Sequence, residues 1–346
     1  MRVYSKLFNK IVDAENLFSA WDEFKRGKRN KLDVMFFEKD LEQNIFRLHR
    51  ELVDKKYKHG AYSDFYIYDP KLRHIHKATV RDRILHHAIF QVLNPIFEPT
   101  FISHSFSCRV GKGTHKGVEM LGEILRKVSK NHTKTTYALK CDVRKFFDSV
   151  DHTILTQFLR RKIKDTDTLW IMEEIIESFS GQSSNLFIRK GLPIGNLTSQ
   201  LFANVYMNEF DQFMKKELRV KNYVRYTDDF IVVSESEDFL KELVPKIQDF
   251  LCSYLNLELH PSKVMIGKYH RGVDFLGYVS FPHHRSLRKR TEKRMVRKLD
   301  EKIEMAKRGQ ITEEKLKQTL ESYLGALSHA TARRLSHNLS NKVWFK

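Results

Sequence analysis

The segment at residues 224–233 places two adjacent carboxylates in the middle of a run that otherwise favours β-structure. Its sequence is Val-Arg-Tyr-Thr-Asp-Asp-Phe-Ile-Val-Val, and the β-branched and aromatic residues on both sides of the acids are typical of strands. We therefore predict a β-hairpin with Thr227, Asp228 and Asp229 as its tight turn. Neighbouring carboxylates raise each other's cost of ionisation, and a divalent cation with oxygen ligands, such as Mg²⁺, relieves that cost. On this segment alone, a plain hairpin turn in which Asp serves only the turn geometry is the alternative.

A second candidate strand, residues 137–143, also carries an acid at its end. Its side chains alternate between two faces with the period of two that a strand has, and Cys141 is expected in the core. Asp142 lies at the end of this strand, and the following residues predict a turn into a helix in which Asp148 and Asp151 serve as cap or turn residues. If the strand lies beside the hairpin, Asp142 converges with the hairpin acids. Two Mg²⁺ ions about 3.5–4 Å apart would then hold the attacking and leaving oxygens of a reaction at phosphorus.

The order of these acids and of the segments between and after them resembles the palm motifs of reverse transcriptases. The resemblance implies an α+β right-hand polymerase fold with an antiparallel palm sheet, and an RNA-directed DNA polymerase activity. The motifs in chain order are Asp142 with Phe147 five residues on, then Gly-Leu-Pro-Ile-Gly-Asn-Leu-Thr-Ser-Gln at 191–200, Tyr-Thr-Asp-Asp at 226–229, Leu-His-Pro-Ser-Lys at 259–263 and Phe-Leu-Gly-Tyr at 275–278.

The fourth block narrows the resemblance to the reverse transcriptases of diversity-generating retroelements. Group II intron enzymes typically carry Gln-Gly-x-x-x-Ser-Pro there, whereas this chain has Ile194, Gly195 and then Ser199-Gln200. The segment at 80–88, in the expected fingers, also resembles the reverse transcriptases of diversity-generating retroelements. That family copies a template RNA into cDNA with errors opposite adenine, which diversify a target gene, and it works with a small basic accessory protein that forms a ring. A retron or phage-defence reverse transcriptase, a degenerate group II intron enzyme, and an RNA-binding protein with a vestigial polymerase fold are the alternatives.

The resemblance also implies roles for single residues. It makes Asp142, Asp228, Asp229 and Lys263 catalytic, the last as a general acid for pyrophosphate. Two Mg²⁺ ions, with Mn²⁺ as a substitute, are expected on the three acids and the carbonyl of Val143. Phe147 corresponds to the steric gate that excludes a 2′-hydroxyl, with core packing as its alternative. The residues expected to contact the incoming dNTP are Arg73, Arg83, Arg144, Phe147, Ile194 and Gly195.

The charge of the chain indicates a polyanionic partner. Lys and Arg number 62 against 43 Asp and Glu, a net charge of +19. Residues 285–346 are the most basic part, with 17 basic and 7 acidic residues. We expect this segment to hold an RNA–DNA template–product duplex by its backbone, although a helical protein-docking module is an alternative. The candidate nucleic-acid contacts are Lys112, Arg288, Lys289, Arg290 and Arg294.

Helical and strand periodicity divide the chain into three expected regions. Residues 1–100 are assigned to fingers, with helices at 16–30, 32–53 and 81–97 and a hairpin of 64–69 and 74–78 around a turn at 70–73. Residues 101–284 are assigned to a palm, with helices at 197–216 and 235–257, and residues 285–346 to a basic helical thumb. Three cysteines without metal-ligand spacing and the lack of a signal peptide predict a cytoplasmic protein, and no apolar run predicts a membrane helix.

Overall fold

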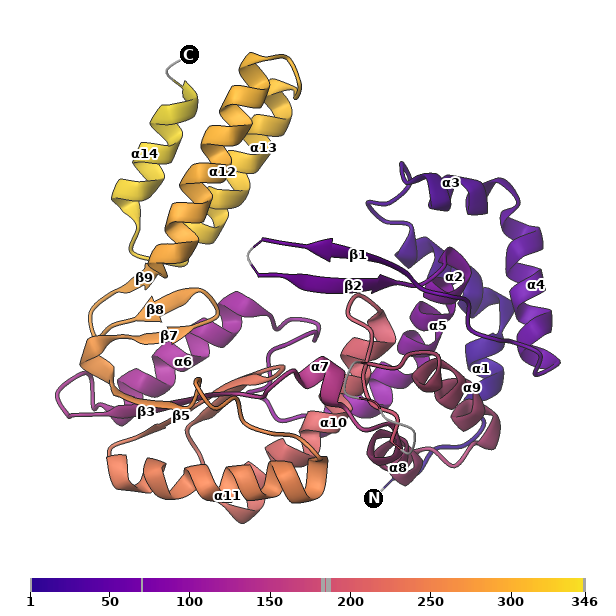
Figure 1. Ribbon diagram of the computed structural model, residues 1–346, viewed down its shortest axis with the longest axis horizontal. Coiled ribbons are helices and arrows are strands. Elements are labelled where there is room, and N and C mark those ends of the chain that lie inside the picture. Colours follow the sequence, from indigo (N-terminus) through magenta and orange to yellow (C-terminus); the bar gives the residue numbers. More distant parts are fainter. Residues whose placement is uncertain (1, 70, 182–183, 185–187, 345–346) are drawn as a thin grey trace. The chain divides into compact units, whose positions relative to one another are not determined.

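The computed structural model describes residues 2–69, 71–181, 184 and 188–344 (Figure 1). Pro70, in the predicted turn at 70–73, lies outside the described residues. The chain forms two compact units, each built from three segments of sequence. Unit 1 comprises Met1–Arg109, Asp142–Lys221 and Pro245–Pro261, and unit 2 comprises Val110–Cys141, Asn222–Val244 and Ser262–Lys346.

The first part of unit 1 is helical. Helix α5 packs against α2 through apolar side chains that include Leu17, Trp21 and Ile89, all buried. The prediction of one helix over 32–53 is wrong, because Asp40 adopts φ −119° and ψ 43° and separates two helices. The helices are α1 (Phe8–Val12), α2 (Ala14–Phe24), α3 (Leu32–Lys39), α4 (Leu41–Val53) and α5 (Val80–Phe97), followed by the 3₁₀ turn η1 (Glu98–Thr100).

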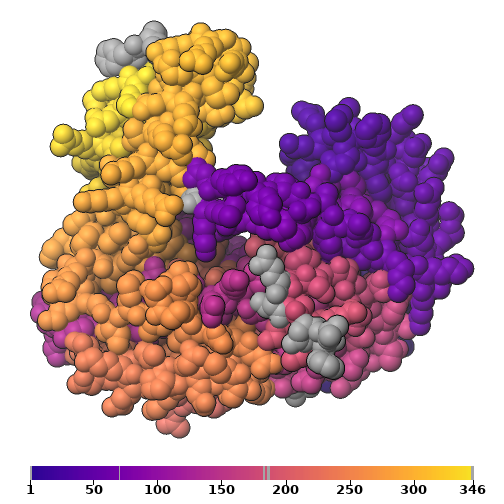
Figure 2. Space-filling view, viewed as in Figure 1, coloured from indigo at the N-terminus to yellow at the C-terminus, as the bar shows by residue number. Residues whose placement is uncertain are grey.

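The hairpin predicted over 64–69 and 74–78 is present, with slightly different bounds. Strand β1 (Ser63–Ile67) pairs antiparallel with β2 (Arg73–Lys77), so that Tyr66 lies opposite His74. All five side chains of β1 are exposed, and the hairpin forms part of the surface seen in Figure 2, where it is purple. Strand β1 is therefore uncovered, whereas every residue of β2 after Arg73 is half-buried.

The remainder of unit 1 surrounds a long buried helix. Helix α10 (Leu197–Gln212) buries Phe202, Tyr206 and Phe210, and a π-helical turn η2 (Phe213–Glu217) extends it. Asp151 accepts hydrogen bonds from the first backbone amides of α8, as predicted for a cap. The other helices are α7 (Phe146–Ser149), α8 (His152–Lys162), α9 (Thr166–Glu177) and α11 (Glu237–Leu255), the last of which begins in unit 2.

Unit 2 is built on a four-stranded sheet with the strand order β4-β5-β3-β6, of which β3 and β5 are labelled in Figure 1. Strands β4 and β5 are antiparallel, as are β3 and β6, and α6 (Thr114–Val128) packs on β4 and β5. Every residue of β4 and β5 between Tyr223 and Val233 is buried except the four at the turn, 226–229. The strands are β3 (Tyr137–Asp142), β4 (Tyr223–Tyr226), β5 (Asp229–Ser234) and β6 (Met265–Lys268).

A second sheet and a helical bundle complete unit 2. The bundle consists of α12 (Lys289–Lys307), α13 (Glu313–Leu327) and α14 (Arg333–Trp344), which lie side by side (Figure 1) and bury Leu299, Leu320 and Leu339. The predicted α+β class is confirmed. Within the described ranges, no helix has both the length and the apolar character needed to cross a bilayer. The second sheet contains β7 (Val273–Phe275), β8 (Tyr278–Ser280) and β9 (Arg285–Leu287), preceded by the 3₁₀ turn η3 (Tyr269–Arg271).

A buried arginine fixes the irregular segment that follows η1. Arg109 forms a forked ion pair with Glu98, at 2.7–3.1 Å, and donates to the carbonyls of Ile102 at 2.6 Å and Ser105 at 2.8 Å. Its side chain is only 6% exposed. Guanidinium suits this position because a single planar fork can satisfy a carboxylate and two carbonyls at once.

We predict that Arg109→Ala lowers the free energy of unfolding by about 3 kcal/mol, because it leaves Glu98 and two carbonyls without their donor. Urea denaturation followed by circular dichroism measures the change. Arg160, which pairs with Glu173 at 2.6 Å on an exposed surface, is the matched control, and its replacement by Ala is expected to cost about 1 kcal/mol or less. Equal losses for the two variants would contradict the assignment.

Candidate active site

The predicted acidic hairpin is present, but its turn is shorter than expected. Tyr226 pairs with Asp229, so Asp229 is the first residue of β5 and the turn consists of Thr227 and Asp228 alone. Thr227 has φ 56°, a left-handed conformation that is unfavourable for a β-branched residue. Arg225 on β4, fully buried, donates to the carbonyl of Thr227 at 3.0 Å and so helps to hold this conformation.

Strand β3 is the neighbour of β5 in the sheet, and Asp142 is its last residue. The backbone amide of His260 donates to the Asp142 carbonyl at 2.8 Å, and Val143 forms an antiparallel bridge with Leu259. In such a bridge the hydrogen bonds come from the flanking residues, here 142 and 144. The carbonyl of Val143 is therefore directed to the opposite side of its chain from Leu259. Cys141 is buried, as predicted.

A lysine near the end of β3 lies beside the acidic hairpin. The ammonium of Lys140 is 4.0 Å from Asp229 Oδ2 and 3.6 Å from Asp274 Oδ1, and it donates to the Asp274 carbonyl at 2.8 Å. Lys140 and Asp142 are two residues apart on one strand, so their side chains leave the same face of the sheet. Neither Lys140 nor Asp274 was predicted from sequence as part of the site, although the two-residue spacing between Lys140 and Asp142 was a usable signal for Lys140.

The chemistry of the available donors suits Mg²⁺. Asp142 and Asp228 are half-buried carboxylates at the ends of elements of one sheet, and Mg²⁺ prefers oxygen ligands. Over the described part of the chain, no three His, Cys, Asp or Glu side chains are grouped closely enough to hold a metal by themselves.

Phe147 and the 191–196 segment lie together in unit 1. The ring of Phe147 is half-exposed and meets the buried ring of Phe146 edge to face at 5.4 Å. The amide of Leu192 donates to the Phe147 carbonyl at 2.7 Å, which ties the one-turn helix α7 to that segment. The Ile194 carbonyl accepts from the amide of His76 on β2 at 3.4 Å, and Gly195 has φ 118°.

The three arginines expected to contact the triphosphate have different surroundings. Arg83 makes an ion pair with Asp33 at 2.6 Å and lies over the ring of Phe24 at 4.7 Å, so its guanidinium is engaged within unit 1. Arg144 is exposed and lies 3.3 Å from Glu258. Arg73 is exposed at the start of β2. The structure therefore leaves Arg73 and Arg144 more accessible than Arg83.

The expected nucleic-acid contacts of unit 2 also differ among themselves. Lys289 and Arg290 are exposed in the first turn of α12, and Arg294 is half-exposed one turn later. Arg288, immediately before the helix, makes an ion pair with Asp274. Lys112 is half-buried in the loop before α6, and Lys263 is half-buried in the turn before β6. The bundle also pairs Arg297 with Glu301, Lys307 with Glu304, and Lys342 with Asp300 at 2.6–3.0 Å.

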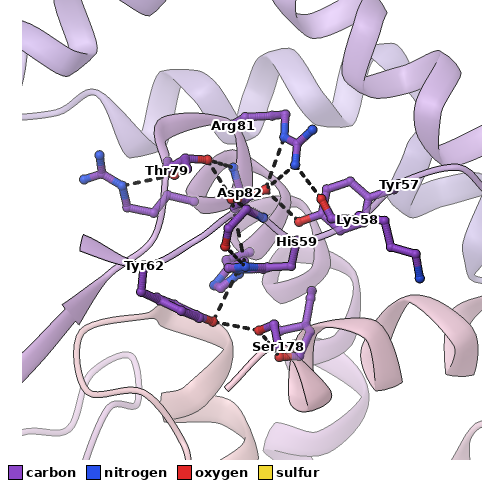
Figure 3. A network of polar contacts seen from close by, with 12 residues as sticks. Tyr57, Lys58, His59, Tyr62, Thr79, Arg81, Asp82 and Ser178 are labelled. Atoms are coloured by element: carbon purple, nitrogen blue, oxygen red, sulfur yellow. Dashed lines mark hydrogen bonds and ion pairs between the residues drawn. The ribbon is translucent and has the colours of Figure 1, made fainter. Parts of the chain in front are cut away.

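A buried polar network in unit 1 was not predicted (Figure 3). Asp82 is completely buried and accepts from Tyr57 Oη at 2.8 Å, Thr79 Oγ1 at 2.6 Å and the Gly60 amide at 3.1 Å, with Arg81 as an ion-pair partner at 3.1 Å. Burial alone would raise the pKa of Asp82, but the Thr79 hydrogen bond and the charges of its neighbours hold that pKa below its usual value. The aspartate therefore stays ionised in the core.

Two histidines extend this network to the start of α10. His59 Nδ1 donates to the Gly60 carbonyl at 2.7 Å. His86 Nε2 lies 3.2 Å from His59 Nε2, and His86 Nδ1 lies 3.1 Å from Thr198 Oγ1, so each pair shares one hydrogen bond. Burial lowers the pKa of His86 to about 3. The hydrogen bond to Thr198 anchors the helix that follows the 191–196 segment.

Paired carboxylates next to a strand end are a donor set found in two-metal enzymes, among them polymerases and nucleases. Residues 57–280 match the family model described as reverse transcriptase (RNA-dependent DNA polymerase). Because the match covers well over half of the sequence, the chain belongs to the reverse transcriptase family.

Curated relatives include intron-encoded proteins. The protein YkfC of Escherichia coli is 26% identical over 255 residues, which cover 64% of this chain and 65% of YkfC. The group II intron-encoded protein LtrA of Lactococcus lactis is 24% identical over 309 residues, covering 68% of this chain and 49% of LtrA. An uncharacterized 91 kDa protein in the cob intron of Schizosaccharomyces pombe is 25% identical over 256 residues, 57% of this chain and 31% of that protein. The chain thus spans about one third to two thirds of their lengths.

We predict that acid weakens the fold through His86. The folded-state pKa of about 3 lies below the unfolded value near 6.5, so the unfolded chain binds the proton first and stability falls as pH drops below about 6.5. Between pH 7 and pH 5 the free energy of unfolding should fall by about 2 kcal/mol through this histidine. His86→Gln should remove that part of the pH dependence, as measured by unfolding in urea. His270→Gln, at an exposed site, is the control. An unchanged pH dependence in His86→Gln would refute the assignment of a neutral, buried His86.

Proposed function

We propose that this protein is an RNA-directed DNA polymerase that uses two Mg²⁺ ions, with Mn²⁺ as a substitute, held by Asp142 and Asp228. The observation that carries the proposal is that the acidic hairpin and the strand ending in Asp142 are neighbours in one sheet. Membership of the reverse transcriptase family supports the same activity. When bound, the two ions would activate the primer 3′-hydroxyl and neutralise the triphosphate and the departing pyrophosphate.

Each of the remaining residues has a separate task in this proposal. The Val143 carbonyl, directed away from Leu259, supplies a further oxygen ligand, and Asp229 completes the acidic group without being a primary ligand. Phe147 places a half-exposed ring beneath the sugar and excludes a 2′-hydroxyl. Lys263 donates a proton to the leaving pyrophosphate. Arg73 and Arg144, the more accessible of the arginines, contact the triphosphate.

The same proposal assigns residues 1–100 to fingers, 101–284 to a palm and 285–346 to a thumb of a right-hand polymerase fold. The basic bundle would hold the template–product duplex through Lys289, Arg290 and Arg294, whose positions in the first two turns of α12 support phosphate contact. Lys112, in the loop before α6, is a further candidate contact.

We further propose that the enzyme is of the diversity-generating kind. The support is Ile194, which replaces the glutamine typical of group II intron enzymes in a segment bonded to the fingers hairpin through His76. An aliphatic side chain cannot make the hydrogen bonds of an amide, so it would position the templating base less strictly and lower discrimination. A small basic ring-forming accessory protein belongs to this proposal, and cDNA yield with and without such a partner tests it.

The proposed activity predicts that Asp228→Asn with Asp229→Asn lowers cDNA synthesis by at least 10³-fold, since the carboxylates that hold the ions are lost. Binding of an RNA–DNA duplex should change less than three-fold, because cations elsewhere in the chain contact its backbone. Primer extension in Mg²⁺ and fluorescence anisotropy measure the two quantities. A double variant that keeps full synthesis would disprove the assignment, and one that loses both properties would indicate misfolding.

For the subtype, we predict that Ile194→Gln reduces misincorporation opposite template adenine by roughly ten-fold, the scale of one added discriminating contact. Deep sequencing of cDNA made from a defined RNA measures the error at each template base. Ile194→Leu, which keeps an aliphatic side chain, is the control and should retain the errors. Wild-type errors that are rare or spread evenly over the four bases would instead favour a retron or phage-defence enzyme.

A further inference from the structure

The ammonium of Lys140 lies between two carboxylates that belong to different strands. It donates a hydrogen bond to the backbone carbonyl of Asp274 at 2.8 Å. The two nearest carboxylate oxygens are Asp274 Oδ1 at 3.6 Å and Asp229 Oδ2 at 4.0 Å, both beyond good hydrogen-bond distance. Lys140 is therefore attracted by both acids without being committed to either.

Arg288 approaches the same carboxylate oxygen of Asp274 as Lys140 does. Its guanidinium pairs with Asp274 Oδ1, and its backbone amide donates to the Gly277 carbonyl at 2.9 Å. The Asp274 carboxylate thus has two cationic neighbours, and the guanidinium is the nearer one. All four residues lie in unit 2, where they form a chain of alternating charge in the order Asp229, Lys140, Asp274 and Arg288.

We propose that Lys140 is a positioning residue that partitions between Asp229 and Asp274, and that Arg288 sets this partition. The inference rests on the proposed function, in which Asp229 completes the acidic group beside the metal ligands Asp142 and Asp228. While Arg288 neutralises Asp274, Lys140 interacts mainly with Asp229 and reduces the negative charge at the acidic hairpin. When Arg288 is drawn away from Asp274, Lys140 moves toward Asp274, and the acidic hairpin becomes more negative and binds a divalent cation more tightly.

The position of Arg288 identifies what would draw it away. It directly precedes α12, whose next two residues, Lys289 and Arg290, are exposed cations. Its own side chain is 41% exposed, so a phosphate oxygen of a nucleic-acid backbone can compete with Asp274 for the guanidinium. Arrival of the duplex at the first turn of α12 would in this way raise the affinity of the hairpin acids for Mg²⁺. Arg288 then acts as a sensor of the duplex as well as a contact to it.

Three single substitutions are expected to shift the dissociation constant for Mn²⁺, two of them downward and one upward. Lys140→Met removes the cation beside Asp229, and Arg288→Met leaves Asp274 to attract Lys140, so both should lower the dissociation constant for Mn²⁺. Asp274→Asn removes the competing acid and leaves Lys140 to Asp229, so it should raise that constant. Each change is expected to be roughly three- to ten-fold, the range for charges about 4 Å apart near a protein surface. Electron paramagnetic resonance of free Mn²⁺ measures the constant on the full chain without turnover.

Lys241→Met is the matched control, since Lys241 makes exposed ion pairs with Glu237 and Asp238 on α11 and should leave Mn²⁺ binding unchanged. Thermal unfolding of every variant checks that it is folded. Added RNA–DNA duplex should tighten Mn²⁺ binding in the wild type and have less than a two-fold effect in Arg288→Met. The proposal is overturned if Asp274→Asn and Arg288→Met shift the constant in the same direction, or if all variants match the wild type. The dissociation constants of the wild type and the variants could follow the predicted order while the wild type makes no cDNA. That result would contradict the proposed function and leave this inference standing.

Discussion

The burial of β4 and β5 on both faces is the constraint on which the rest of the site depends. Strands enclosed in this way accept apolar side chains, so charged groups can stand only where the hairpin turns. The buried Arg225 makes an exception to this pattern, and it donates to the Thr227 carbonyl at the turn itself. Sheet packing therefore fixes both the place of the two aspartates and the strained conformation between them.

The helices and strands that carry this site could be predicted from sequence because their apolar residues recur with the period of a strand or of a helix. The hairpin at 224–233 and the strand ending in Asp142 match the residues expected, and Cys141 is buried. The helix predicted over 197–216 is present as α10 over 197–212, followed by a π-helical turn. The turn was predicted one residue too long, because propensity does not reveal that Asp229 pairs with Tyr226. Apolar spacing likewise predicted one helix over 32–53, but the first helix ends before Asp40. The spacing indicates which residues are buried and carries no information on backbone angles.

Pairings between distant residues could not be predicted. Arg83 and Arg288 were selected as cations for an external anion, yet each has an internal acid partner, Asp33 and Asp274. Composition counts charges but does not tell which of them meet after folding. The Asp82 network depends in the same way on residues brought together from three parts of unit 1, including Thr198. Such networks require the fold before they can be recognised.

The ion pairs of α12–α14 bear on how a duplex would be held at different salt concentrations. Binding of a polyanion releases condensed counterions, and the slope of log K against log salt reports the number of phosphates neutralised. A cation that already faces Glu301, Glu304 or Asp300 is partly neutralised before any phosphate arrives. The slope should therefore be much shallower than the 17 basic residues of 285–346 would give if all acted independently. If the slope of log K against log salt is shallow, duplex binding weakens less as the ionic strength rises.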